Sequence, residues 1–156
     1  MAYFNIINAD LLTATETYIA HQCNCISTDA KALAKSLFDK YPYANTYKKR
    51  IYKNVQTHTQ PGTIDVLEGH PQIINMYAQY YPHIAKYNND TQEKRIVWFQ
   101  ECLTHISNIE NIKHQTIAMP YNIGCGAAGG NWNIYSKMIE DFANDNQIYV
   151  TLYKFF

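Results

Sequence analysis

The chain has few charged residues and no long apolar run. Charged side chains make up 17% of its 156 residues, and 13 basic and 13 acidic side chains give a formal net charge of zero. A balanced chain has no overall positive field to hold a nucleic-acid backbone. No apolar run approaches the roughly 20 residues of a membrane-spanning helix, and no basic segment followed by an apolar stretch marks a signal peptide. We therefore expect an intracellular protein, cytoplasmic or nuclear and not secreted, with neither membrane nor nucleic acid as partner.

Cysteine is scarce as well. The four cysteines fit neither a disulfide framework nor the ligand spacing of a zinc site; they are Cys23, Cys25, Cys102 and Cys125. We expect a reducing compartment, no metal and no cofactor. Hydrophobic residues make up 47% of the chain, enough for the buried core of one ordinary domain. We expect a single domain spanning residues 1–156, and a monomer.

Predicted strands and helices alternate along the chain. Segments rich in β-branched and aromatic residues predict strands at 3–7, 18–22, 64–67, 73–78, 116–119 and 149–156. Apolar residues at helical spacing predict helices that begin near residues 30, 90 and 131, with a weaker helical stretch at 44–53. Thr28 or Asp29 can cap the first helix, and Asp90-x-x-Glu93 has the pattern of a capping box for the next. This alternation predicts an α/β fold whose sheet is covered on both faces.

Glycine is sparse except at one place. Four of the six glycines fall within residues 124–130, between a predicted strand and a predicted helix. In that arrangement, backbone N–H groups and a helix N-terminus can face an anion. No Lys-Ser or Lys-Thr follows the loop, and no GxGxxG opens the first strand–helix unit, so neither a P-loop nor a Rossmann site is expected. The alternative is a tight structural turn that packs the third helix onto the sheet.

A second polar segment follows the predicted strand at 18–22. Ligands of open α/β sheets bind beyond the carboxyl ends of strands. His21 is a candidate general acid or base near neutral pH, and Asn24 can both donate to and accept from a ribose hydroxyl pair. The alternatives are a hydrogen-bonded core residue for His21 and a turn former for Asn24.

These segments together resemble the macrodomain family, and within it the branch with ADP-ribose 1''-phosphate phosphatases and the terminal ADP-ribose protein glycohydrolase. The matching motifs occur in order and at the right spacing: NADLL at 8–12, IAHQCNC at 19–25, KALAKSLFDKYP at 31–42, MPYNIGCGAAGGNW at 119–132 and VTLYKF at 150–155. The resemblance implies a three-layer α/β/α fold with a mixed, mostly parallel sheet of about six strands. It implies ADP-ribose or ADP-ribose 1''-phosphate as ligand, and ADP-ribosylated proteins as further partners.

The resemblance also implies roles for individual residues. Asp10 accepts a hydrogen bond from the adenine amino group, Phe155 packs against the adenine ring, and Asn24 holds the distal ribose. The loop that wraps the phosphates and that ribose consists of Ile123, Gly124, Cys125, Gly126, Ala127, Ala128 and Gly129. The alternatives are a solvated turn residue for Asp10 and a core residue for Phe155. Cys125 is either a thiol with a lowered pKa at a helix N-terminus or a small space-filling residue.

The chain departs from the family pattern in its first loop. Residues 26–32 contain no glycine, so Ser27, Thr28 and Lys31 can offer side-chain donors where the family uses backbone. Asp29 repels a diphosphate unless Lys31 or the helix N-terminus compensates. It is therefore either a catalytic acid or base, or a first-turn carboxylate that caps the helix.

A second departure concerns catalysis. The terminal glycohydrolase uses a lysine nucleophile and an aspartate, and these positions fall at Gln79 and Ala128, which excludes a lysine adduct. The remaining catalytic candidates are His21, Asn24 and Asp29, with His83 of second rank. The basic run 48–50 is expected to be a solvated helix face without a site role.

We therefore expect a hydrolase acting on an ADP-ribose derivative, either an ADP-ribose 1''-phosphate phosphatase or a de-ADP-ribosylating hydrolase. The alternative is a non-catalytic reader, a module that recognises ADP-ribose without turning it over.

Overall fold

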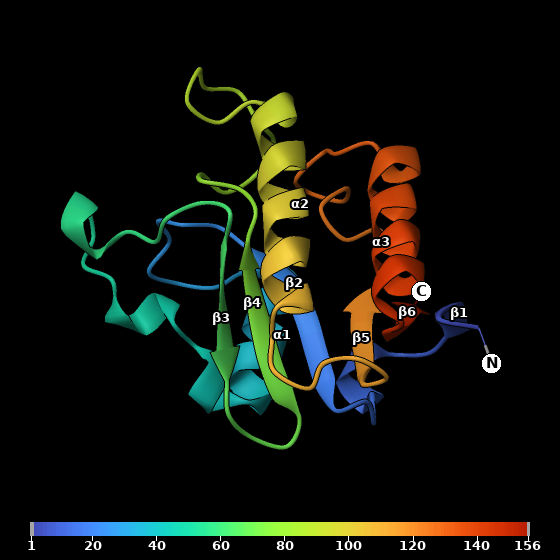
Figure 1. Ribbon diagram of the computed structural model, residues 1–156. Coiled ribbons are helices and arrows are strands. Elements are labelled where there is room, and N and C mark those ends of the chain that lie inside the picture. Colours follow the sequence, from blue (N-terminus) through green and yellow to red (C-terminus); the bar gives the residue numbers. More distant parts are fainter. Residues whose placement is uncertain (1, 156) are drawn as a thin grey trace.

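A six-stranded sheet forms the centre of the molecule in a computed structural model, which describes residues 2–155 (Figure 1). The strands are β1 (Phe4–Asn8), β2 (Tyr18–Cys23), β3 (Thr63–Leu67), β4 (Gln72–Tyr77), β5 (Thr116–Pro120) and β6 (Tyr149–Lys154). Their order is β1-β6-β5-β2-β4-β3, and every neighbouring pair is parallel except β3–β4. The mixed, mostly parallel sheet is confirmed. Phe156, the last residue of the predicted final strand, lies outside the described residues.

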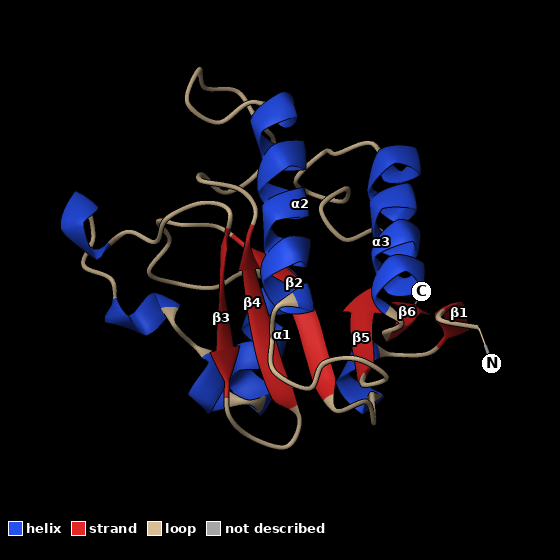
Figure 2. Cartoon of the chain, in the orientation of Figure 1, coloured by secondary structure: helices blue, strands red, loops and turns tan. Residues whose placement is uncertain are grey.

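Helices cover both faces of the sheet and give the predicted three layers. They are α1 (Ala32–Lys40), α2 (Gln92–Ser107) and α3 (Trp132–Asn146). On one face α2 packs against β3 and β4, and α3 packs against β1 and β6; on the other face α1 packs against β2. Figure 2 shows α2 and α3 side by side in front of the sheet. The helices within residues 2–155 are all too short or too polar to cross a membrane.

Two apolar clusters fill the space between these layers. Side chains of consecutive strand residues point to opposite faces, so on β4 Ile74 packs towards α2 and α3 while Ile73 packs towards α1. Phe99 of α2 and Ile139 of α3 join the first cluster, and Leu37 of α1 joins the second. All five side chains are fully buried. The sheet is therefore packed on both faces, and this packing fixes the position of its carboxyl edge, from which the loops after the strands begin.

The capping-box prediction is wrong by one residue. The N-cap of α2 is Thr91, whose hydroxyl accepts a hydrogen bond from the Lys94 N–H at 3.1 Å. Asp90 is fully buried and forms an ion pair with Arg95 instead. A charge-assisted contact with a guanidinium stabilises a buried carboxylate better than a capping N–H does.

The start of α1 also differs from its prediction. The N-cap position is Lys31, which makes no side-chain capping bond, and Thr28 and Asp29 lie in bends before it. Ala32, the first helical residue, has φ +50°, in the left-handed region that favours glycine. The helix therefore begins from a strained turn rather than from a capped one.

The predicted weak helix at 44–53 is wrong. Between residues 42 and 57 the chain forms three single 3-10 turns instead: η2 (Pro42–Ala44), η3 (Tyr47–Lys49) and η4 (Val55–Thr57). The side chains of Asn45 and Asn54 accept hydrogen bonds from nearby backbone N–H groups, which competes with a continuous helix. Figure 1 shows this segment, in teal, projecting from the body of the molecule beside β3.

Candidate ligand-binding site

Most of the residues predicted for the site follow strands that run parallel to one another, whereas His21 lies within β2. Asp10 follows β1, Asn24 follows β2, the glycine loop 123–130 follows β5, and Phe155 follows β6. These four strands are neighbours in the order β1-β6-β5-β2. Their carboxyl ends therefore meet at one edge of the sheet, where open α/β sheets bind ligands.

Two of the predicted residues line one hollow at this edge. A cavity of about 540 Å³ opens among the ends of β1, β5 and β6, and Asp10 and Phe155 both line it together with Tyr121. Phe155 is 68% exposed, so the alternative of a core phenylalanine is wrong. One oxygen of Asp10 accepts a hydrogen bond from the Leu12 N–H at 3.0 Å. Its second oxygen has no hydrogen-bond partner within residues 2–155 and can accept one from a ligand.

A larger hollow lies at the opposite edge of the sheet. It measures about 810 Å³ and is lined by residues 14–17 and 68–72, at the amino ends of β2 and β4, with Tyr41. It contains none of the predicted site residues. The carboxyl edge is therefore the candidate site.

The glycine loop closes on itself through its own backbone. The N–H of Gly129 donates to the carbonyl of Gly126 at 3.0 Å, and that of Gly130 donates to the carbonyl of Gly124 at 3.1 Å. Four N–H groups of the loop have no partner within residues 2–155; they belong to Gly124, Gly126, Ala127 and Ala128. Unpaired backbone donors at the start of a helix are the groups that bind anions in proteins.

The glycines of this loop are not all needed for the turn. Gly124 and Gly129 both have φ +76°, and a Cβ on Gly130 would lie 2.6 Å from the carbonyl oxygen of Gly124. A tight structural turn accounts for these three. Gly126 is different: its φ is outside the left-handed region, and a Cβ there would meet only Asn122 Nδ2, at 3.8 Å. The turn alone therefore gives no reason for glycine at position 126.

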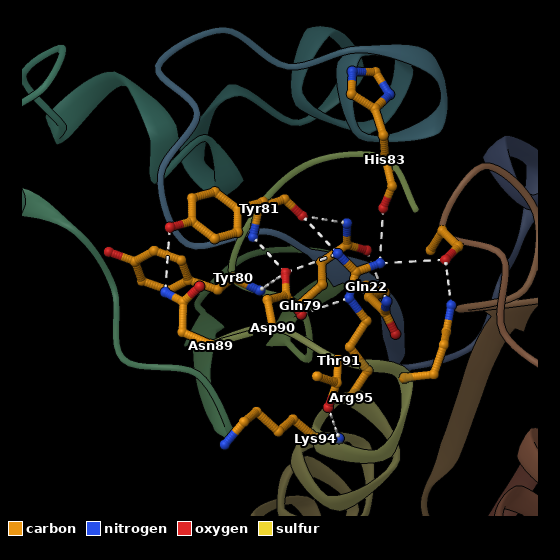
Figure 3. A network of polar contacts seen from close by, with 12 residues as sticks. Gln22, Gln79, Tyr80, Tyr81, His83, Asn89, Asp90, Thr91, Lys94 and Arg95 are labelled. Atoms are coloured by element: carbon orange, nitrogen blue, oxygen red, sulfur yellow. Dashed lines mark hydrogen bonds and ion pairs between the residues drawn. The ribbon is translucent and has the colours of Figure 1, made fainter. Parts of the chain in front are cut away.

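A buried ion pair contacts the glycine loop through a hydrogen bond to the loop's backbone. Asp90 and Arg95 contact each other at 2.7 and 2.8 Å through two oxygens and two nitrogens. Arg95 Nη1 donates to the carbonyls of His83 at 2.7 Å and Ala128 at 3.2 Å. Figure 3 shows the guanidinium between Asp90 and the chain at 80–83, with the His83 imidazole pointing away from this network. Sequence reasoning missed this pair because Asp90 matched a capping pattern.

The first loop is built around Asn24 and a buried arginine. Asn24 Oδ1 accepts hydrogen bonds from the N–H groups of Ile26 at 3.1 Å and Ser27 at 2.8 Å, so the side chain acts as a turn former. Arg50 donates to the carbonyls of Asn24 at 2.8 Å and Ser27 at 2.9 Å. It is only 6% exposed, and the expectation of a solvated residue is wrong for Arg50. Asp29 is exposed on this loop.

His21 lies in the core rather than in the site. It is 1% exposed, its Nε2 is 2.7 Å from Asn75 Oδ1, and its ring meets Phe38 edge-on. Because the Asn75 amide nitrogen donates to the carbonyl of Ala44, its oxygen is the acceptor and the neutral imidazole carries its proton on Nε2. Burial lowers the pKa of His21 to about 4. This environment is that of the hydrogen-bonded core residue and does not favour proton transfer near neutral pH.

Neither Gln79 nor Cys125 supplies a nucleophile. Gln79 is buried and accepts a hydrogen bond from Gln22 Nε2 at 2.8 Å while donating to the carbonyl of Tyr81 at 2.9 Å. Burial raises the pKa of the Cys125 thiol to about 11, so the thiol is protonated at neutral pH and the lowered pKa is not supported. Residues 2–155 also hold no cluster of three His, Cys, Asp or Glu side chains that could bind a metal ion.

Several solved structures with a similar fold are macrodomains. The macrodomain of Mycobacterium tuberculosis DarG matches with a TM-score of 0.70 at 18% identity, over 98% of each chain. That of Thermus aquaticus DarG matches at 0.72 and 18%, over 98% of this chain and 99% of the other. Thermosipho africanus DarTG, solved in complex with ADP-ribose, matches at 0.70 and 17%, over 99% of this chain and 42% of the other. No protein-family model and no curated protein matches the chain. The chain therefore has a macrodomain fold.

Proposed function

We propose that this chain binds ADP-ribose, or a derivative of it, at the carboxyl edge of β1, β6, β5 and β2. The observation that carries the proposal is Gly126, a glycine that the turn does not require, in a loop whose backbone donors are unpaired. A missing Cβ leaves room for a ligand to approach the backbone closely. The Thermosipho africanus protein, which has a similar fold, is solved with ADP-ribose.

Each part of ADP-ribose has a matching group at this edge. Asp10 and Phe155 line one cavity, where a carboxylate suits the adenine amino group and an exposed ring suits its face. The glycine loop offers N–H groups to the phosphates. The first loop offers the Asn24 amide nitrogen and the hydroxyls of Ser27 and Thr28 to the distal ribose. A ligand that spans these groups is a dinucleotide-like molecule with adenine at one end and a sugar at the other.

Recognition without turnover is the activity that the site supports best. His21 is buried and its pKa is lowered to about 4, so it is a poor acid or base for a ligand outside the core. Gln79 and Ala128 stand where a lysine and an aspartate would be needed for a covalent lysine intermediate. A reader module needs neither group.

Hydrolysis of ADP-ribose 1''-phosphate is the second candidate, and the exposure of Asp29 favours it. In that reaction Asp29 would take a proton from a water molecule that attacks phosphorus. The bond from phosphorus to the ribose oxygen would break, and that oxygen would leave as a hydroxyl after taking up a proton from solvent water, while Asp29 releases its proton to solvent.

Gly126→Ala tests the binding site directly. We expect the dissociation constant for ADP-ribose, measured by calorimetry, to rise at least tenfold (about 1.4 kcal/mol), because the added methyl group occupies the approach to the loop. Adenosine, which has no phosphate, serves as the matched ligand and should bind as before. Thermal unfolding checks that the fold is intact. Unchanged ADP-ribose affinity would place the phosphates elsewhere, and no binding by the unaltered protein would reject the proposed function.

Turnover is tested with the same protein. ADP-ribose 1''-phosphate and an ADP-ribosylated protein are supplied separately, and release of phosphate and of ADP-ribose is measured. We expect no release with either substrate. Phosphate release that Asp29→Asn abolishes, with ADP-ribose binding retained, would instead establish the hydrolase.

A further inference from the structure

The molecule buries two arginines, and only one of them has an acidic partner. Arg95 is 1% exposed and is paired with Asp90. Arg50 is 6% exposed, and none of the ion pairs within residues 2–155 includes it. Burying a cation without a counter-charge is costly. The burial of Arg50 without a counter-charge therefore needs a reason other than the stability of the fold.

The groups around Arg50 are neutral. Its guanidinium stacks over the ring of Tyr47 at 4.4 Å, lies 5.7 Å from the ring centre of Tyr77, and donates to Thr59 Oγ1 at 2.8 Å. Asp65 accepts a hydrogen bond from the Tyr77 hydroxyl, so this carboxylate reaches Arg50 only through the tyrosine and does not contact it directly. Arg50 Nε is buried and has no hydrogen-bond partner within residues 2–155. Aromatic faces stabilise a cation in part, but they do not neutralise it.

The position of Arg50 directs its charge towards the first loop. Arg50 Nη1 donates to the carbonyl of Ser27 at 2.9 Å. In a trans peptide the C=O and the N–H point in opposite directions, so the N–H of Thr28 points away from the guanidinium. That N–H has no partner within residues 2–155. The arginine thus polarises a peptide group whose N–H is unpaired and points away from the guanidinium, on a loop that contains no glycine.

We propose that Arg50 is the specificity residue with which this glycine-free loop holds an anionic ligand. It does not touch the ligand. Its charge and its hold on the Ser27–Thr28 peptide orient and strengthen the Thr28 donor, and the phosphate of the ligand is the missing counter-charge. This inference rests on the proposed function, since it assigns one phosphate of ADP-ribose to the first loop.

The test separates charge from mere support of the loop. Arg50→Gln removes the charge but keeps one amide donor, whereas Arg50→Lys keeps the charge but loses the fork of donors. Calorimetry with ADP-ribose and with neutral adenosine gives the ratio of the two affinities. We expect Arg50→Gln to weaken ADP-ribose binding about tenfold, the size of a partly screened charge interaction, with adenosine unchanged. Arg50→Lys should keep most of the preference for ADP-ribose.

Thr59→Val is the matched control. It removes a neutral contact of the guanidinium and leaves the charge in place, so the ratio of affinities should stay as in the unaltered protein. A structural role alone would weaken ADP-ribose binding as much in Arg50→Lys as in Arg50→Gln, because both lose the fork of donors, and that result would overturn the inference. An unchanged ratio in Arg50→Gln would overturn it too.

Inorganic pyrophosphate gives a readout that does not depend on ADP-ribose. We expect it to raise the melting temperature of the unaltered protein, less so at high salt, and not to raise that of Arg50→Gln. Failure of ADP-ribose to bind while pyrophosphate still stabilises through Arg50 would reject the proposed ligand but keep the anion site. Binding of ADP-ribose with no effect of pyrophosphate at low salt would reject the role of Arg50 alone.

Discussion

The two loops assigned to the proposed site are built in opposite ways. The loop at 124–130 follows β5, contains four glycines, exposes backbone donors and rests on Arg95, whose charge Asp90 neutralises. The loop at 24–31 follows β2, contains no glycine and rests on Arg50, whose charge no carboxylate neutralises within residues 2–155. The glycine loop offers unpaired N–H groups, and the arginine that contacts it is already neutralised by a carboxylate. The second loop also has four N–H groups without a partner within residues 2–155, those of Thr28, Asp29, Ala30 and Lys31, but they lie near a charge that no carboxylate compensates. Glycine is therefore one of two ways to prepare a loop for an anion.

We expect the two buried arginines, Arg95 and Arg50, to differ most in how much their loss of support lowers the free energy of unfolding. Asp90→Ala leaves Arg95 buried without a partner, and we expect the free energy of unfolding to fall by about 3–5 kcal/mol. Arg50→Gln removes a charge that has no partner, so we expect a loss of only about 1–2 kcal/mol from its hydrogen bonds. Urea denaturation measures both.

Asp39→Ala is the control for this comparison. Asp39 pairs with Lys35 on the surface, where the two side chains are 66% and 61% exposed, and we expect a change below about 0.5 kcal/mol. Equal losses in Asp90→Ala and Arg50→Gln would mean that the two arginines are supported alike, and the contrast between the loops would fail.

A second effect concerns pH and the strand before the first loop. The pKa of His21 is about 4 in the folded protein because of burial, against 6.5 in the unfolded chain. The unfolded chain therefore binds more protons between these values, so the contribution of His21 is constant above about pH 6.5 and is lost as the pH falls towards about 4. The loss approaches about 3 kcal/mol. His21→Gln should flatten the fall in stability between pH 6.5 and 4, and an equally steep fall in that variant would show that other groups cause it.

Much of the fold could be predicted from local patterns, because periodicity and turn residues act within a few positions of the chain. The helix with Phe99 and the glycine loop were found in this way. His21 was not assigned correctly by its pattern, since its partner Asn75 lies 54 residues away on the neighbouring strand. A polar residue on an apolar strand looks the same in sequence whether it faces a ligand or a buried amide.

The supports of the two loops were missed for a similar reason. Arg50 stands in a run of basic residues that is exposed at Lys48 and Lys49, and only the return of residues 50–59 onto the first loop buries it. Asp90 satisfied a local capping pattern, while its actual partner, Arg95, is five residues on and one turn into α2. The first error comes from long-range packing, and the second from an ion pair within the chain's own neighbourhood that outcompetes the cap.

The smallest predicted effect tests whether the first loop tolerates glycine. Ala32 has φ +50°, where a non-glycine residue is strained by about 1–2 kcal/mol. Glycine relieves that strain but loses about 0.5–1 kcal/mol more conformational freedom on folding, so Ala32→Gly should raise the free energy of unfolding by about 0.5–1 kcal/mol. Ala34→Gly, inside the same helix, should lower it by about 1 kcal/mol. If both variants lose stability alike in urea denaturation, Ala32 is not strained. If only Ala32→Gly gains stability, position 32 has a side chain although its backbone conformation favours glycine. Position 126 is the reverse case, a glycine whose backbone conformation does not require one.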